Sequence, residues 1–143
     1  MKLTRKIVRL LGAAGFAIAA SVASAEVVVI VNSASPVASA APDDVAQIFL
    51  GKRNDIGGNS LVAVDQAEGS ASRAVFYDKV VQKNPSQLNA YWSRLIFTGK
   101  GAPPRQVGSD AEVVDAVLED EETIGYIDSA AVTEGVKVIY TVK

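Results

Sequence analysis

The sequence of 143 residues contains no cysteine and no histidine. A chain without cysteine has to be held together by packing alone, because no disulfide can form. The two absences also exclude thiol nucleophiles, serine–histidine dyads and the usual ligands of zinc, copper and haem. We therefore expect no cofactor and no bound metal.

Carboxylates are the remaining metal ligands, and the chain has one dense acidic run, from Glu119 to Glu122. The run lacks the spaced ligands and the glycine of a calcium loop, so we interpret it as the solvated end of a helix and the turn after it. A basic patch with interleaved aromatic residues is also missing, which argues against nucleic-acid binding.

The first 25 residues have the pattern of a secretory signal peptide. Basic residues come first, an apolar stretch follows from Ile7 to Ala20, and Ala23-Ser24-Ala25 is a cleavage site of small residues. The apolar stretch is too short and too rich in alanine and glycine for a stable membrane span. We predict that residues 1–25 are a signal peptide and that residues 26–143 form one soluble, secreted domain without a membrane span.

Cleavage after Ala25 would change the charge of the protein. All 16 acidic residues follow Ala25, whereas 4 of the 14 basic residues precede it, so the mature chain would carry a formal charge of −6 instead of −2. Such an acidic chain does not attract anions over a long range. Any anion site therefore has to work through local N–H and hydroxyl groups.

Strand patterns alternate with helix patterns along the mature chain. The first strand pattern, Glu26–Asn32, is a run of Val and Ile without polar alternation, which predicts a strand buried on both faces and central in its sheet. The alternation predicts an α/β fold, a three-layer α/β/α sandwich with a mixed, mostly parallel sheet. The other predicted strands are Leu61–Val64, Ile124–Ile127 and Val136–Val142, and the predicted helices are Pro42–Leu50, Ser70–Lys83, one from Pro85 and one after Ser109.

Two of these helices begin with a capping box, Asn84 with Gln87 and Ser109 with Glu112. The helix from Pro85 has the clearest apolar stripe of the chain, and its Tyr91 and Trp92 belong to that stripe, which favours core packing over ligand stacking. The predicted core positions of the two helices are Leu88, Tyr91, Trp92, Leu95 and Ile96 in the first and Val113, Val114, Val117 and Leu118 in the second.

A strand, a turn of small residues and the start of a helix follow one another between residues 61 and 77. The helix start leaves backbone N–H groups unpaired, with the positive end of the helix dipole behind them. Ser70 and Ser72 add hydroxyl donors, and Gly69 and Ala71 do not block an approaching anion, so this turn can bind an oxyanion. An ordinary helix N-cap explains the same residues, and the two interpretations stay open here.

Several further segments before and after this turn follow one another in an order that can be compared with known protein families. They are Asp43-Asp44-Val45, the segment Ile48 to Lys52, Tyr91-Trp92, Phe97-Thr98-Gly99 and the segment Thr123 to Ile127. With the turn, they resemble the phosphate-binding subunit of bacterial phosphate ABC transporters, which is a type II periplasmic binding protein. The resemblance covers nearly the whole mature chain and implies a periplasmic location.

In that family a G-S-G-T turn after a strand wraps the phosphate. Gly69-Ser70-Ala71-Ser72 matches this turn position for position, so the resemblance implies that Ser70 and Ser72 donate hydrogen bonds to the oxyanion. Glu68 falls where the family has an acidic residue that accepts a hydrogen bond from protonated phosphate.

Gln66 departs from the family pattern, because the family usually has an arginine at this position. Arg73 is the nearby residue that can supply the missing charge. Ser33 and Ser35 follow the first strand, and ligands of open α/β sheets bind beside the carboxyl ends of strands. The loop with these two serines either converges with the turn or is a plain linker.

The family has two such lobes, and this chain resembles the lobe between the hinges. The resemblance implies a periplasmic binding module for inorganic phosphate or another small oxyanion, acting alone, as a homodimer or beside an ABC transporter. The alternative is a non-transport protein of the envelope that interacts with other proteins and has lost tight ligand binding. We expect no enzymatic activity, since neither a histidine nor an S-x-x-K arrangement can activate Ser70.

Overall fold

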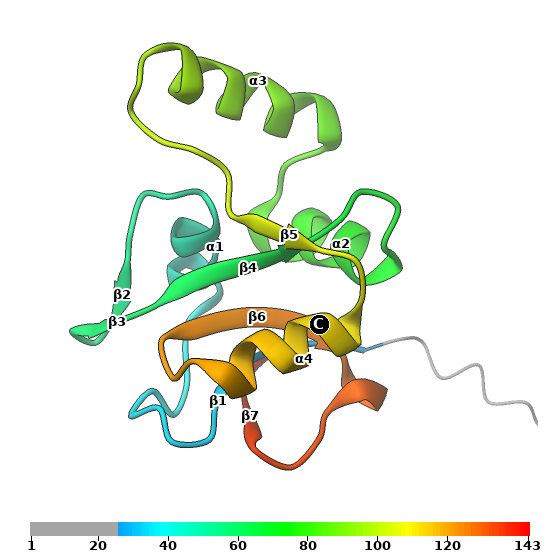
Figure 1. The fold of residues 1–143 in the computed structure, drawn as a ribbon. Coiled ribbons are helices and arrows are strands. Elements are labelled where there is room, and N and C mark those ends of the chain that lie inside the picture. The colour runs from blue at the N-terminus through cyan, green and yellow to red at the C-terminus, as the bar shows by residue number, and fades with distance from the viewer. Residues whose placement is uncertain (1–25) are drawn as a thin grey trace, which may run out of the picture.

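The computed structural model describes residues 26–143, so the predicted signal peptide lies outside the described residues. The strands are β1 (Val27–Asn32), β2 (Asp55–Ile56), β3 (Asn59–Ser60), β4 (Val62–Gln66), β5 (Arg105–Val107), β6 (Thr123–Asp128) and β7 (Val136–Thr141). The helices are α1 (Pro42–Phe49), α2 (Ala71–Phe76), α3 (Pro85–Phe97) and α4 (Asp110–Glu119), with a π-helical turn η1 (Tyr77–Val81) and a 3₁₀ turn η2 (Ser129–Ala131) (Figure 1). Within residues 26–143, no helix has the length and apolar character needed to cross a membrane.

Five strands form one sheet in the order β5-β4-β6-β1-β7, and β2 pairs with β3 in a separate hairpin. β4 pairs in parallel with β5 and with β6, whereas β1 runs antiparallel to both β6 and β7. Four strands therefore share one direction and β1 opposes them. The predicted mixed, mostly parallel sheet is confirmed.

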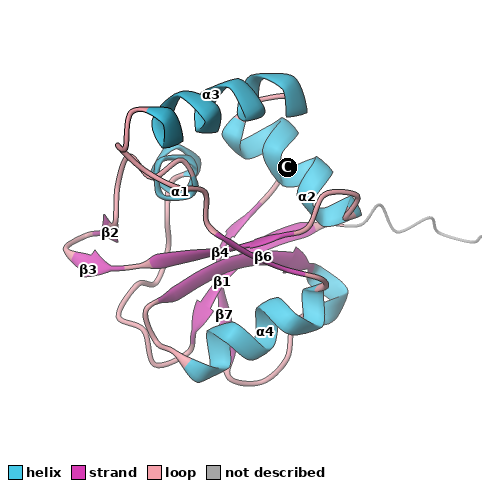
Figure 2. Ribbon diagram, turned by 45° about the horizontal axis from the view of Figure 1, so that its top comes forward, coloured by secondary structure: helices cyan, strands magenta, loops and turns pink. Residues whose placement is uncertain are grey.

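Helices cover both faces of this sheet, as Figure 2 shows, with α1, α2 and α3 on one side and α4 on the other. α3 is the outermost helix of its side. It packs through Leu88 and Trp92, and the Tyr91 hydroxyl donates to the carbonyl of Leu50 just after α1, at 2.6 Å. The three-layer α/β/α sandwich predicted from the sequence is confirmed.

β1 supplies side chains to both cores. Val27, Val29 and Val31 pack into the core under α1, α2 and α3, while Val28 and Ile30 pack into the core under α4. This burial on both faces explains why the strand shows no polar alternation. β1 lies inside the sheet as expected, although the middle strand is β6.

The helix starts follow their sequence signals closely. Asn84 and Gln87 form a complete capping box at α3, with bonds of 2.8 and 3.0 Å. At α4, the Ser109 hydroxyl accepts from the Glu112 amide, but the Glu112 carboxylate accepts from the amide of Gly108 instead of Ser109. The predicted box at Ser109 is therefore present in one half only.

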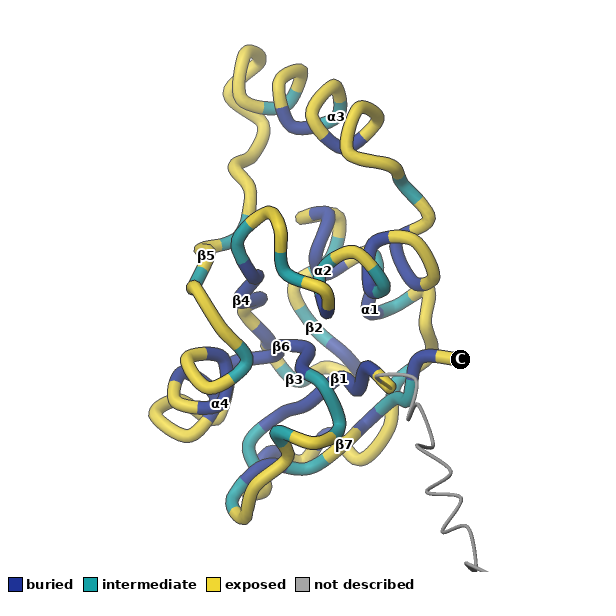
Figure 3. Tube along the Cα trace, turned by 90° about the vertical axis from the view of Figure 1, so that its right-hand side faces the viewer, coloured by how far each residue is buried: buried dark blue, intermediate teal, exposed yellow. Residues whose placement is uncertain are grey.

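Three helix predictions need correction. The segment predicted as one helix to Lys83 changes to a π-helical turn at Tyr77 and stops at Gln82, which has a left-handed backbone with φ of 58°. Leu118 is 43% exposed, because at about 100° per residue it lies outside the arc of α4 that Val113, Val114, Ala116 and Val117 bury. Ile96 is likewise exposed, at 56%, in the last turn of α3, which Figure 3 shows as the helix farthest from the sheet.

The acidic run after α4 is solvated as predicted. Glu119 is the last residue of α4, and the following three acidic residues are exposed in a turn before β6. Among residues 26–143, no group of three or more acidic side chains is arranged to hold a metal ion.

Candidate anion site

The turn of interest joins the carboxyl end of β4 to α2. Gly69 has φ of +91°, a left-handed conformation that glycine adopts without strain, and no atom lies within 4 Å of where its Cβ would be. β4 lies between two strands that run parallel to it, so the carboxyl ends of all three strands meet at one edge of the sheet. Ligands of α/β proteins typically bind at such an edge.

Ser70 is the N-cap of α2. Its Oγ accepts a hydrogen bond from the backbone N–H of Arg73 at 3.3 Å and donates one to Oε1 of Gln66 at 2.5 Å. The capping role considered from the sequence is therefore present, and it does not exclude ligand binding, because the amides at the first positions of a helix have no partner within the helix.

Ser72 points toward α4. Its side chain is buried, and its Oγ donates to Oδ1 of Asp110 at 3.1 Å. The side-chain amide of Gln66 donates to the same carboxylate oxygen at 2.7 Å and to the carbonyl of Tyr126 at 2.8 Å. Two donors from β4 and α2 therefore converge on one anionic oxygen, which belongs to the first residue of α4.

Gln66 occupies the position at which the resembled family usually has an arginine. Only 1% of its surface is exposed, and its side chain bonds to Ser70, Asp110 and Tyr126. It therefore contributes a neutral, fixed amide to the site and no positive charge.

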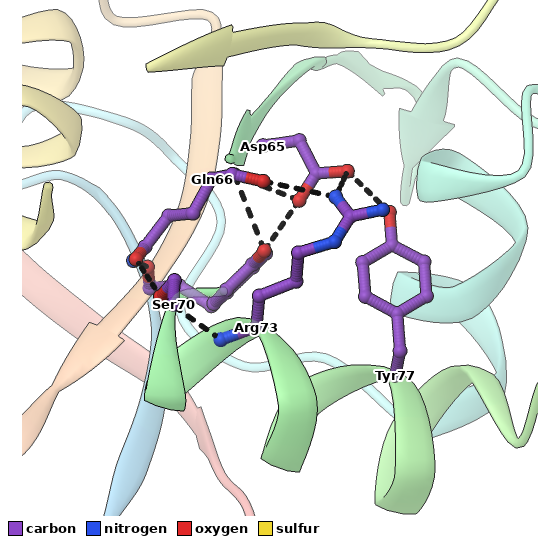
Figure 4. A network of polar contacts seen from close by, with 6 residues as sticks. Asp65, Gln66, Ser70, Arg73 and Tyr77 are labelled. Carbon is purple, nitrogen blue, oxygen red and sulfur yellow. Dashed lines mark hydrogen bonds and ion pairs between the residues drawn. The ribbon is translucent and has the colours of Figure 1, made fainter. Parts of the chain in front are cut away.

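Arg73 turns away from the ligand side of the turn and toward β4 (Figure 4). Its Nη1 donates to Oδ2 of Asp65 at 2.8 Å and to the carbonyl of Gln66 at 2.9 Å, and its guanidinium stacks 4.6 Å from the ring centroid of Tyr77. Because a carboxylate compensates its charge, Arg73 does not replace the missing arginine charge in this structure.

Asp65 lies at the centre of the buried part of this network. The hydroxyl of Tyr77 donates to Oδ2 at 2.5 Å, and the hydroxyl of Tyr126 donates to Oδ1. The side chain of Asp65 is 3% exposed, so the ion pair with Arg73 is shielded from water. In the sequence, Asp65 is the acidic residue that directly follows the predicted strand Leu61–Val64.

The network shifts the pKa values of its members. Burial raises the pKa of Tyr77 and of Tyr126 well above the ordinary value, and the negative charge of Asp65 and its hydrogen bonds raise both further. Burial lowers the pKa of Arg73. The charge interactions with Asp65, Tyr77 and Tyr126 together raise it by more, so the net shift of this pKa is upward. Both phenols therefore stay protonated and Arg73 stays charged at neutral pH.

Ser33 and Ser35 do not converge with the turn. β1 is antiparallel to β6, and Val31 pairs with Ile124, which also pairs with Ala63 near the start of β4. The loop after β1 consequently lies at the edge of the sheet opposite the turn. There Ser35 is buried and accepts from the amide of Val37, so the loop does not reach the candidate turn.

A cavity of about 530 Å³ opens beside the turn. Glu68, Gly69 and Ala71 line it on the turn side, and Arg73 and Lys83 bring two cationic side chains to its wall. The cavity lies between the turn, the outer side of α2 and the start of α3. Arg73 is already paired with Asp65, so Lys83 is the cationic residue of this wall whose charge the network around Asp65 does not compensate, and Gln66, Ser72 and Asp110 lie outside the cavity lining.

Asp110 is the site residue that the sequence analysis missed. Its position in the chain could have indicated it, because Asp110 follows β5 as the turn follows β4. Val107 of β5 pairs with Gln66 of β4 in a parallel register. Residues that follow neighbouring parallel strands meet at the same edge of a sheet.

No family model matches the sequence, and a comparison with curated proteins gives no match. Solved structures with this fold do exist. An ABC-type phosphate transport receptor from Vibrio cholerae aligns with a TM-score of 0.64 and 21% identity, over 80% of this chain and 45% of that one. A putative phosphate ABC transporter substrate-binding protein from Clostridium perfringens, solved with bound phosphate, aligns with a TM-score of 0.65 and 21% identity, over 80% and 44%.

PstS from Borrelia burgdorferi is a third such structure, with a TM-score of 0.60 and 15% identity over 80% of this chain and 46% of that one. The chain therefore spans just under half the length of these proteins. It has the fold of one lobe of phosphate-binding proteins of ABC transporters, and the resemblance seen in the sequence is confirmed at the level of the fold.

Proposed function

We propose that this chain is a binding module for phosphate or a similar small oxyanion, with the ligand at the turn from Gly69 to Ser72. The observation that carries the proposal is the convergence of Gln66 Nε2 and Ser72 Oγ on a single carboxylate oxygen. Two buried donors that hold one anionic oxygen can hold the oxygen of an external oxyanion in the same way.

The surroundings support this assignment. The turn lies at the carboxyl edge of parallel strands, and Lys83 lies in the wall of the cavity beside it. Glu68 lines the same cavity and is available to accept a hydrogen bond from a protonated ligand oxygen. The similar solved structures are described as transport receptors or substrate-binding proteins, and one of them holds phosphate.

The proposed partners are therefore inorganic phosphate or a related oxyanion, and, for the protein as a whole, an ABC transporter or a second copy of the chain in the periplasm. We expect this lobe by itself to bind weakly, in the millimolar range. Its donors are neutral or, in Arg73, already paired, and a hydrogen bond that remains open to water contributes only about 1 kcal/mol.

A titration with phosphate followed by amide NMR shifts tests the proposal. The amides from Gly69 to Arg73 should move with phosphate, and Ser72→Ala should weaken binding several-fold, because it removes a donor without touching the N-cap at Ser70. Ser35→Ala is the matched control, since Ser35 is also buried but lies at the opposite edge of the sheet. If phosphate and sulfate leave these amides unmoved, the oxyanion function is refuted.

A second candidate function, a protein-interaction module of the envelope, has an observation of its own. The last turn of α3 exposes two large apolar side chains, Ile96 at 56% and Phe97 at 92%. In addition, the hydroxyls of Ser70 and Ser72 already have partners within the chain. The same titration separates the two functions, because an interaction module predicts no response to oxyanions.

A further inference from the structure

The carboxylate of Asp110 accepts hydrogen bonds from two buried donors at the edge of the sheet where the candidate turn lies. Its Oδ1 lies 2.7 Å from Nε2 of Gln66 and 3.1 Å from Oγ of Ser72. Both donors are buried, with 1% and 7% of their surfaces exposed, whereas Asp110 itself is partly exposed at the start of α4. The acceptor is thus the one member of the contact that can leave into water.

The contact joins elements from opposite faces of the sheet. Ser72 belongs to α2 on one face, Asp110 belongs to α4 on the other, and Gln66 ends β4 between them. An acidic residue in the first turn of a helix is common, because the helix dipole favours it there. The dipole of α4 does not require that this residue also accept from two side chains of other elements.

We propose that Asp110 is an internal ligand of the anion site: it holds the donors in the absence of an oxyanion, competes with any oxyanion for them, and so sets the affinity of the site. This inference rests on the proposed function. An incoming anion meets the like charge of Asp110 at the position it has to occupy, so binding requires the side chain to rotate out toward solvent.

Removal of Asp110 should therefore strengthen binding. Without the carboxylate, one N–H of Gln66 and the hydroxyl of Ser72 lose their acceptor inside the protein, and buried donors without partners are unfavourable. An external oxyanion restores both bonds without displacing a competitor. We expect Asp110→Ala to bind inorganic phosphate about tenfold more tightly than the unchanged protein, the size of effect that one charge-assisted contact produces.

The experiment is a titration of residues 26–143 and its variants with inorganic phosphate, measured by amide NMR shifts at constant ionic strength. Asp110→Asn is the second variant, because its amide has the shape of the carboxylate and keeps α4 intact even where alanine does not. Asp115→Asn is the matched control, since Asp115 is an exposed residue of the same helix and the change removes the same charge.

Tighter binding by both Asp110 variants, with Asp115→Asn unchanged, is the expected result. In the unchanged protein, phosphate should also shift the amides of Ser109 to Glu112 as the carboxylate leaves. If the unchanged protein binds phosphate and the Asp110 variants bind it equally or more weakly, this inference is wrong while the proposed function stands. If neither the protein nor the variants bind, both fail. Equal strengthening by Asp115→Asn would show a general charge effect and would also overturn the inference.

Discussion

A buried carboxylate decides the chemistry around the turn at the scale of single residues. Asp65 accepts from Arg73, Tyr77 and Tyr126, and this shell keeps the charge of Arg73 on the β4 side of the helix. Hydrogen bonds to a charged group contribute about 1.5–3 kcal/mol each. The network therefore stabilises the fold. At the same time it keeps the guanidinium of Arg73 from pairing with a ligand at the candidate site.

The raised pKa values of the two tyrosines predict how stability depends on pH. A group whose pKa is higher in the folded state stabilises the fold below its unfolded pKa, which is about 10 for tyrosine, and loses that contribution as the pH rises above it. The free energy of unfolding should thus be steady up to about pH 10 and fall beyond it.

Urea unfolding between pH 7 and pH 11 measures this dependence. Tyr77→Phe should lower stability by about 1.5–3 kcal/mol at pH 7, because it removes a donor to Asp65, and should flatten the fall above pH 10. The control is a pH titration of the folded protein, in which tyrosine absorbance reports how far the phenols ionise. If Tyr77 and Tyr126 ionise near pH 10 in the folded protein, the assigned network is wrong.

At the scale of elements, one glycine allows α4 to lie close to the sheet. A Cβ on Gly125 of β6 would lie 2.4 Å from Cγ1 of Val113, a fully buried and β-branched residue of α4. The close approach brings Val113 and Val117 into the second core and places the start of α4, with Asp110, beside the turn.

Gly125→Ala should therefore destabilise the protein by about 1–3 kcal/mol, the usual effect of overpacking a core. In a Val113→Ala background the added methyl has room, so Gly125→Ala should destabilise the protein much less. Thermal unfolding of the unchanged protein, the two single variants and the double variant measures this coupling as a double-mutant cycle. Gly101→Ala is the control, because its Cβ would meet only a side-chain atom of Leu95 at 4.0 Å. Additive effects of the two substitutions would contradict the predicted clash.

At the scale of the whole molecule, two surfaces are available for the proposed self-association. β7 is an edge strand of the sheet, but the amide of Ala40 already donates to the carbonyl of Ile139, so the loop after β1 covers part of that edge. The end of α3, with Ile96 and Phe97, is uncovered. Exposed apolar residues make this end the better candidate for an interface.

Light scattering over a concentration series should show dimers of residues 26–143 at micromolar to tens of micromolar concentrations, as expected for a weak interface. Replacement of both Ile96 and Phe97 by Ser should return the protein to a monomer, whereas Val138→Lys, on the edge strand, should have little effect. The opposite pattern would place the interface at β7. A monomer at millimolar concentration would exclude the homodimer.

The sequence by itself determined the features that depend on neighbouring residues. The Val and Ile run of β1, the N-caps at Ser70, Asn84 and Ser109, and the strand–turn–helix order at the candidate site all follow from local periodicity and local hydrogen bonding. Because these signals are local, they also carried the resemblance to one lobe of a phosphate-binding protein, which the fold confirms.

Tertiary structure decided which of these local features meet. The antiparallel direction of β1 moved Ser33 and Ser35 away from the turn, and the parallel pairing of β4 with β5 brought Asp110 to Gln66, 44 residues away in the chain. The pairing of Arg73 with Asp65 depended in addition on Tyr77 of η1 and Tyr126 of β6, which both donate to Asp65, and on the ring of Tyr77 beneath Arg73. Strand direction and order arise from packing the whole sheet between its helices, and no short stretch of sequence contains that information.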